Sequence, residues 1–409
     1  MAPGAARNWL SRIVVIVTIC SAVFLDNAFA DGRTEWAVMA YLSGQDDLEA
    51  DAEAYLDTIM RAARDGECAA AVQIDGAGEC VRWLRQPGEM RQRRRMGVAN
   101  MGAQSTLSSF MSWAWQNLEA DRYILIVLGH GTGLATLEPG LSGVAFDGGS
   151  CDALTLPELA GALDESRPRG TRVDLVALEA CYAAGLEVAY GLRTVADYMI
   201  ASPDRVPSPG LPWATTLAGL SGYTDAGAVI DALCSSYSHA LVGMNLGATA
   251  EVADALGELV EALHVNLSTN ARFVRLVRSR TRSWGYRNEM CDLLELANLL
   301  QLMAPDDVVE RCAAELAAAV DGAIIGGNQQ QTANAEVHPG NLGIFFPAGW
   351  EDVPDHYRQE YVLAAETGWA DFLHAYFEAS GRPLRASGRA YHGYGVIDSS
   401  YTYNAAAAL

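Results

Sequence analysis

The fold is decided by two apolar runs that each lead into a reactive side chain. The first reads Tyr123-Ile-Leu-Ile-Val-Leu-Gly129 and continues into His130, and the second reads Val173-Asp-Leu-Val-Ala-Leu178 and reaches Cys181 three residues later. Continuous apolar runs of this length are typical of parallel strands that are covered on both faces. In open α/β sheets, functional residues lie just beyond the carboxyl ends of such strands. We therefore expect His130 and Cys181 at one sheet edge, as a base and a nucleophile.

The residues before these runs alternate between strand and helix patterns. Glu35–Leu42 and Ala69–Ile74 are strand candidates, and residues 46–63 between them keep helical spacing. A hairpin is expected over 79–98, across the Pro87-Gly88 turn. Such β-α-β order predicts a parallel sheet.

Alternation continues to about residue 225, so a doubly wound, mostly parallel sheet flanked by helices is the predicted architecture. Residues 131–151 are expected to form a Gly-rich loop. Helical spacing then dominates, at 226–241, 250–265, 288–303 and 306–321, before a strand-like run over 341–347. The predicted domains are a signal peptide at 1–30, a catalytic core at 31–225, a mainly helical C-terminal portion at 226–388 and a tail at 389–409.

The N-terminus has the pattern of a secretory signal peptide. Arg7 and Arg12 precede the apolar run Ile13–Leu25, and Ala28-Phe29-Ala30 supplies a small-residue cleavage site. We expect a secreted or periplasmic protein without a stable membrane anchor after cleavage; a retained anchor is the alternative. The formal charge of −22 also disfavours nucleic acid as a partner, because binding it requires a basic face.

Seven cysteines remain after the predicted cleavage, and an odd number leaves at least one free thiol. Sequence order suggests three pairs, Cys68 with Cys80, Cys291 with Cys312, and Cys151 with Cys234. Buried free thiols are an equally good interpretation of each pair.

The two strand ends carry the chemistry of an acyl transfer. A thiol reacts as a thiolate, or with a base at hand, and His130 is the natural base for Cys181. The backbone N–H groups of Gly131 and Cys181 can bind the developing oxyanion. A helix just after Cys181 would add its positive end and favour the thiolate.

Other chemistries lack their residues. Gly129-His-Gly131-Thr-Gly133-Leu134 has leucine where a dinucleotide-binding G-x-G-x-x-G requires glycine, and no G-x-S-x-G is present. No Cys/His pair has zinc spacing, so no metal site is predicted.

Several fragments, in order, resemble the clostripain-like cysteine peptidases of family C11, which share a caspase-like fold. The fragments are Trp36–Glu49, Val98–Gly102, Leu128–Gly133, Leu178–Cys181, Glu187–Arg193, Ala196–Ser202, Asn341–Pro347 and Thr367–Trp369.

The resemblance implies that His130 and Cys181 form a catalytic dyad that hydrolyses proteins or peptides after a basic P1 residue. The family usually has aspartate two residues before the cysteine, near the P1 pocket, where this chain has Glu179. Glutamate keeps the charge but reaches one methylene further; alternatively it packs away and specificity is lost. Asp204 is the second candidate for the P1 cation.

The resemblance also bears on activation and cofactors. Some members cut themselves at a basic residue after the catalytic histidine, but this chain has none between Arg122 and Arg167, which implies a single-chain enzyme or processing elsewhere. No cofactor is required. Calcium dependence occurs in the family, and Asp46, Asp47 and Asp147 are the available ligands, without a calcium-loop pattern.

The leading hypothesis is therefore an exported cysteine endopeptidase that prefers Arg, or Lys, at P1. The first alternative is a catalytically silent protein of the same family that binds peptides or partners. The second is a peptidase of the same fold with non-basic specificity.

Overall fold

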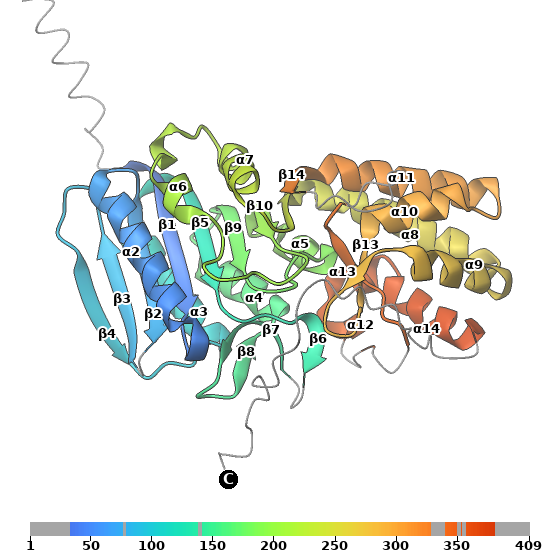
Figure 1. The fold of residues 1–409 in the computed structure, drawn as a ribbon, viewed down its shortest axis with the longest axis horizontal. Coiled ribbons are helices and arrows are strands. Elements are labelled where there is room, and N and C mark those ends of the chain that lie inside the picture. The colour runs from blue at the N-terminus through green and yellow to red at the C-terminus, as the bar shows by residue number, and fades with distance from the viewer. Residues whose placement is uncertain are drawn as a thin grey trace, which may run out of the picture.

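Five parallel strands form the centre of the molecule. The computed structural model describes residues 33–76, 79–137, 141–328, 340–349, 353 and 357–380. The apolar runs become strands within one nine-stranded sheet of order β14-β11-β10-β9-β5-β1-β2-β3-β4 (Figure 1). The parallel strands are β1 (Thr34–Ser43), β2 (Ala69–Gly76), β5 (Ala120–Leu128), β9 (Val173–Glu179) and β10 (Ala196–Ala201).

The chain winds in two directions from β1. It first moves to β2 on one side, and later to β5, β9 and β10 on the other. The reversal places the topological switch point between β1 and β5, which is where open α/β sheets bind ligands. The doubly wound arrangement predicted from the apolar runs is confirmed.

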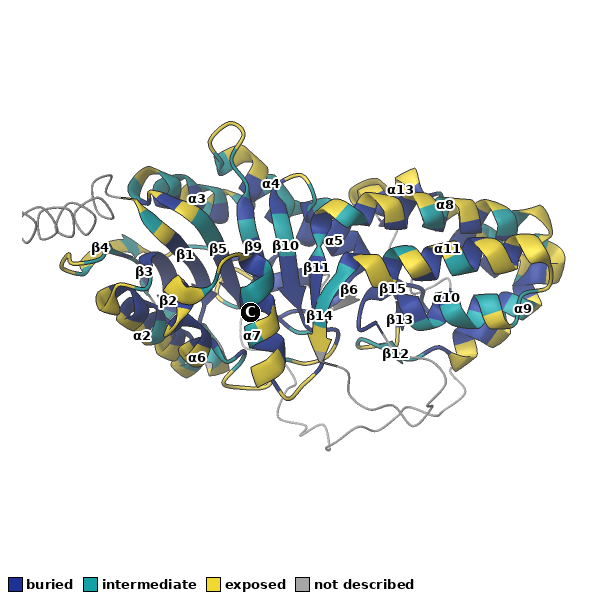
Figure 2. Ribbon diagram, turned by 90° about the horizontal axis from the view of Figure 1, so that it is seen from above, coloured by how far each residue is buried: buried dark blue, intermediate teal, exposed yellow. Residues whose placement is uncertain are grey.

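Helices cover both faces of the sheet, because alternate residues of β1 point to opposite sides. Trp36, Val38 and Ala40 pack with α2 (Glu49–Asp65), α6 (Trp213–Leu217) and α7 (Ala226–Ser236). Ala37, Met39 and Tyr41 pack on the other face with α3 (Gln104–Asn117), α4 (Leu156–Ser166) and α5 (Leu186–Leu192). Figure 2 shows the central strands of the main sheet buried and the outer helix surfaces exposed.

Antiparallel strands close each edge of the sheet. On one side, β3 (Glu79–Arg85) and β4 (Gln92–Gly97) form the predicted hairpin, with Val81 opposite Arg95 and Leu84 opposite Gln92. On the other side lie β11 (Leu241–Asn245) and β14 (Ile324–Asn328).

The sheet therefore extends beyond the boundary placed at residue 225. The helix predicted over 226–241 ends at Ser236, and Leu241 begins β11 instead. A five-residue apolar run cannot be assigned to helix or strand by periodicity alone, which explains the difference.

Residues 131–151, expected to be a loop, mostly form short antiparallel strands. These are β6 (Gly133–Leu137) and β7 (Leu141–Asp147), followed by β8 (Asp152–Leu154). Gly143 lies at φ +129°, and a Cβ there would meet the Leu154 carbonyl oxygen at 2.2 Å. This glycine marks a close approach between strands, a role that sequence composition does not distinguish from a loop.

The C-terminal portion is mainly helical, as the spacing predicted. Its helices are α8 (Thr249–Val265), α9 (Leu267–Arg280), α10 (Leu293–Leu302), α11 (Asp307–Ala323), α12 (Tyr357–Glu360), α13 (Val362–Glu366) and α14 (Trp369–Ser380). The expected late strand is β15 (Gly343–Phe345), which pairs with β13 (Met290–Asp292) and not with the main sheet; β12 (Ser283–Trp284) completes this small sheet.

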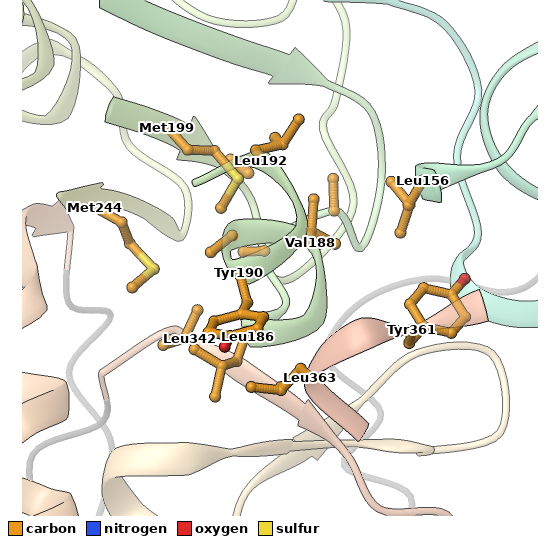
Figure 3. Close-up of a cluster of buried hydrophobic side chains, with 14 of the residues drawn as sticks. Leu156, Leu186, Val188, Tyr190, Leu192, Met199, Met244, Leu342, Tyr361 and Leu363 are labelled. Atoms are coloured by element: carbon orange, nitrogen blue, oxygen red, sulfur yellow. The ribbon is translucent and has the colours of Figure 1, made fainter. Parts of the chain in front are cut away.

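The core continues from the main sheet into the C-terminal portion through α5. Leu186 and Val188 of α5 belong to the same buried cluster as Leu342, Tyr361 and Leu363 (Figure 3). The signal peptide predicted at 1–30 and the tail predicted at 389–409 lie outside the described residues. Within those residues, no helix has both the length and the apolar character needed to cross a bilayer.

None of the three suggested disulfides is formed. Cys68, Cys80, Cys234, Cys291 and Cys312 are buried free thiols, Cys151 is exposed and Cys181 is partly exposed. The alternative interpretation, that the paired cysteines are buried free thiols, holds for all of them except the exposed Cys151.

This thiol distribution predicts a two-step titration with a thiol reagent. In a folded protein produced from Asp31 onward, Cys151 and Cys181 are within reach of the reagent, and the five buried thiols are protected. Ellman's reagent should detect two thiols before unfolding and seven after it in guanidinium. Reducing agent should leave the melting temperature unchanged, and a drop in melting temperature with dithiothreitol would contradict the assignment.

Candidate active site

The register of β5 and β9 brings the two predicted catalytic residues to the same edge. Leu128 is paired with Glu179, and the Gly129 N–H donates to the Glu179 carbonyl at 3.3 Å. His130 and Cys181 each follow two residues after that last pair. Both therefore leave the sheet at the same level on neighbouring strands, as expected.

Gly131 allows the two segments to touch. A Cβ at this position would lie 2.7 Å from the Cys181 carbonyl oxygen and 2.9 Å from the Ala180 Cβ. Within the described residues, the Gly131 N–H has no backbone acceptor, and the Cys181 N–H is directed at its own sulfur. Two adjacent backbone amides beside a thiol are the kind of donors that an oxyanion requires.

Cys181 is held in a mostly buried position that opposes ionisation. Burial raises the pKa of its thiol, while a hydrogen bond from the Val206 N–H to Sγ at 3.4 Å and the nearby charge of Arg205 lower it. The expected helix contribution is smaller than predicted, because α5 begins only at Leu186 and has seven residues. A thiol in this environment requires a base to become a nucleophile.

His130 has a carboxylate partner that the sequence did not indicate. Its Nε2 lies 2.7 Å from Oδ1 of Asp47, and the two side chains are 42% and 43% exposed. Asp47 belongs to η1 (Asp46–Leu48), a short 3-10 turn just after β1. Three neighbouring strand ends, those of β1, β5 and β9, thus contribute to one site.

Residues from two other segments surround Tyr182, the residue after Cys181. Tyr182 has φ +61°, and its N–H donates to the Asp204 carbonyl at 3.1 Å. Its hydroxyl accepts from Arg205 Nε at 3.2 Å, and its ring packs edge-on against Tyr286 at 5.3 Å. Tyr286 comes from the segment between β12 and β13, so the C-terminal portion reaches the candidate site. Sequence reasoning missed Arg205 and Tyr286, because nothing in their local pattern sets them apart.

The two candidate P1 residues occupy different environments. Glu179 is only 2% exposed, and its carboxylate accepts from Trp213 Nε1 at 2.5 Å and from the Leu211 N–H at 3.2 Å. Burial raises its pKa to about 7, against the opposing effect of these hydrogen bonds. Asp204 is exposed, and its Oδ1 accepts from the Arg205 N–H at 2.7 Å. Glu179 therefore anchors the 211–213 segment through buried hydrogen bonds, whereas Asp204 faces solvent.

The acidic residues named for calcium are committed to other contacts where they are described. Asp47 contacts His130, and Asp147 accepts from the N–H groups of Met101 and Ser150, both at 2.8 Å. Glu258, Cys312 and Glu315 lie close enough to hold an ion, but Arg311 already approaches both carboxylates.

Comparison with known proteins shows the family of the chain. A model of the clostripain family of C11 peptidases matches residues 40–376. The clostripain of Hathewaya histolytica is 34% identical over 128 residues, which are 28% of this chain and 24% of that protein. The match thus spans about a quarter of the length of that relative.

Two solved structures share the fold. One is a secreted C11 cysteine protease from Bacteroides thetaiotaomicron in complex with an irreversible peptide inhibitor; it has a TM-score of 0.63 and 17% identity, over 82% of this chain and 99% of that chain. The other is an inactive zymogen C11 protease from Parabacteroides distasonis, with a TM-score of 0.61 and 17% identity, over 82% and 98% of the two chains. These likenesses confirm the predicted α/β fold class.

The buried Glu179 predicts a characteristic pH dependence of stability. Its pKa is 4.5 in an unfolded chain and about 7 in the folded protein, so the folded state holds more protons between these values. Stability from this group is complete below pH 4.5 and is lost as pH rises through 7, by about 3 kcal/mol. Between pH 4.5 and pH 8, the free energy of unfolding in urea should fall by this amount more in the wild type than in Glu179→Gln.

Glu53→Gln is the matched control, because Glu53 is an exposed carboxylate on α2. Its difference from the wild type should stay flat across the same pH range. A wild-type difference from Glu179→Gln that is equally flat would contradict the role of burial.

Proposed function

The chain belongs to the clostripain family of cysteine peptidases, and from this premise we propose that it is an exported endopeptidase whose nucleophile is Cys181. The observation that carries the proposal is the register of β5 and β9, which puts His130 and Cys181 two residues beyond the same strand pair, with the Gly131 backbone packed against Cys181. Protein or peptide chains are the substrates that this chemistry serves.

The proposed reaction begins with a proton transfer. His130 accepts the Cys181 thiol proton, and the thiolate forms a bond to the scissile carbonyl carbon. The carbonyl oxygen becomes an oxyanion facing the Gly131 and Cys181 N–H groups. As the C–N bond breaks, His130 gives its proton to the leaving amine. Water then hydrolyses the thioester, its proton passes through His130, and the free thiol is restored.

Selection of a basic P1 residue is proposed to rest chiefly on Asp204. Its carboxylate is exposed and its main chain is bonded to Tyr182, next to the nucleophile. Glu179, in contrast, has both oxygens engaged by Trp213 and Leu211. Glu179 therefore supports the pocket by holding the segment that carries these residues.

Non-basic specificity is the second candidate, and one observation favours it. Arg205 is hydrogen-bonded to Tyr182 and adds a positive charge beside Cys181. A cationic P1 side chain would meet that charge unless Asp204 offsets it.

Export is proposed from the apolar run at 13–25 and the small residues at 28–30. N-terminal sequencing of the protein from its natural host should begin near Asp31. Calcium dependence stays a prediction of the family resemblance, which activity assays with and without a chelator would test.

Peptidase activity is tested with fluorogenic peptides that carry Arg, Lys or a neutral residue at P1. We expect cleavage after Arg, with Cys181→Ala lowering kcat by more than about 10³-fold. An Arg chloromethyl ketone should label Cys181 and should still label Cys151→Ala, which removes the other accessible thiol. Absence of cleavage and labelling would support the catalytically silent alternative. Cleavage only after neutral residues would support the peptidase with non-basic specificity.

Replacing Asp204 separates the two P1 candidates. Asp204→Asn should lower kcat/KM for Arg substrates about 10-fold and leave neutral substrates unaffected, because an exposed carboxylate pairs only weakly with a cation. Glu179→Gln should affect Arg and neutral substrates alike, since it changes the anchoring of the pocket. Loss of Arg preference in Glu179→Gln alone would reverse these assignments.

A further inference from the structure

Asp47 contacts the imidazole of His130 from a third strand end. The Nε2–Oδ1 distance of 2.7 Å is that of a charge-assisted hydrogen bond. Asp47 is absent from the set of catalytic candidates that the sequence provides, because it lies far from both apolar runs in the chain. It follows β1, which pairs with β5 on the side opposite to β9.

The turn that carries Asp47 is fixed by contacts on several sides. The Gly44 N–H donates to the Asp75 carbonyl at 2.9 Å, and Gln45 Nε2 donates to the Asp75 carboxylate at 2.5 Å. Gln45 Oε1 accepts from the Gly149 N–H at 3.3 Å. A Cβ on Gly44 would lie 2.5 Å from the Ala52 Cβ, so the turn also packs closely on α2. These contacts restrain Asp47, although its own side chain is half-exposed.

The chemistry of the two partners defines which histidine nitrogen carries hydrogen. An ionised carboxylate has acceptor lone pairs and no donor, so the nitrogen facing it must be N–H. In neutral His130 that nitrogen is Nε2, which leaves Nδ1 with the lone pair. Nδ1 is then the atom that can take a proton and give it back.

We propose that Asp47 is a positioning residue that holds His130 in the Nε2–H tautomer, so that Nδ1 exchanges the proton with Cys181 and the leaving amine. The proposal rests on the proposed function and deepens it. Asp47 does not touch the reacting atoms; it acts through the orientation and tautomer of the ring. Other charged or titratable groups around the site include the Cys181 thiol, Asp204, Arg205, Tyr182, Tyr237 and Tyr286.

The kinetic test compares Asp47→Ala, Asp47→Asn and the control Glu53→Gln, which removes one acidic charge from the adjacent helix. Asp47→Ala should lower kcat about 10-fold at unchanged KM, because it alters proton transfer and not substrate binding. Asp47→Asn keeps an acceptor oxygen, so its kcat should fall by less than that of Asp47→Ala. Glu53→Gln should match the wild type, and melting temperatures confirm that all variants are folded.

A spectroscopic test reports the tautomer without any turnover. The protein is labelled with ¹⁵N-histidine in a Cys181→Ala background, and His130→Gln identifies the signals of His130. At alkaline pH, Nε2 should show the shift of a protonated nitrogen and Nδ1 that of an unprotonated one. Asp47→Ala should replace this pattern with the averaged shifts of a tautomer mixture.

The two readouts separate the possible failures. An unchanged kcat or an unchanged tautomer in Asp47→Ala overturns the proposal. If the wild-type protein cleaves no peptide, the proposed function fails, and the spectra alone then decide whether Asp47 holds the ring.

Discussion

Parallel pairing of β5 with β1 on one side and β9 on the other is the constraint on which the candidate site depends. Leu128 is paired with Leu42 on one side and with Glu179 on the other, so strands β1, β5 and β9 end at the same level. The residues that follow are Asp47, His130 and Cys181. Because side chains alternate along a strand, a register shift of one residue would turn the following segment to the other face. The buried apolar residues of these strands therefore fix the site as well as the core.

Glu179 is buried close to Cys181 in the chain and in the fold. A carboxyl group without solvent is costly unless its oxygens are hydrogen-bonded, and here Trp213 and Leu211 meet that requirement. Leu211 and Trp213 lie at the end of the loop whose earlier residue Val206 donates its N–H to Cys181 Sγ. The Glu179 carboxylate and the Val206 amide that contacts the Cys181 sulfur are thus coupled through one loop.

The sequence indicated the main sheet, and the placement of His130 and Cys181 after neighbouring strands, because both depend on local patterns. Apolar runs mark strands, and reactive residues directly after them mark a strand-end site. Both Glu179, from the family resemblance, and Asp204, as the second choice, remained P1 candidates, since sequence does not reveal that Trp213 binds the Glu179 carboxylate. It could not identify Asp47 as a partner of His130, because that contact depends on the order of strands in space.

Smaller elements were missed for a related reason. Strand β11 is too short for its period to be recognised, and the glycines of β6 and β7 resemble those of a loop. Gly143 is needed because the Leu154 backbone approaches it closely, and only the folded chain shows this contact.

The C-terminal portion is a structural part of the catalytic unit and not an appendage to it. Glu187 of α5 is buried, and its Oε1 accepts from the Phe345 N–H at 2.9 Å and from the Tyr357 hydroxyl at 2.7 Å. A buried carboxylate that is stripped of such partners is strongly destabilising, so this contact specifies how the C-terminal portion docks. The same portion supplies Tyr286 against Tyr182 and strands β11 and β14 to the main sheet. Residues after 225 therefore complete both the sheet that positions Cys181 and the rim beside it.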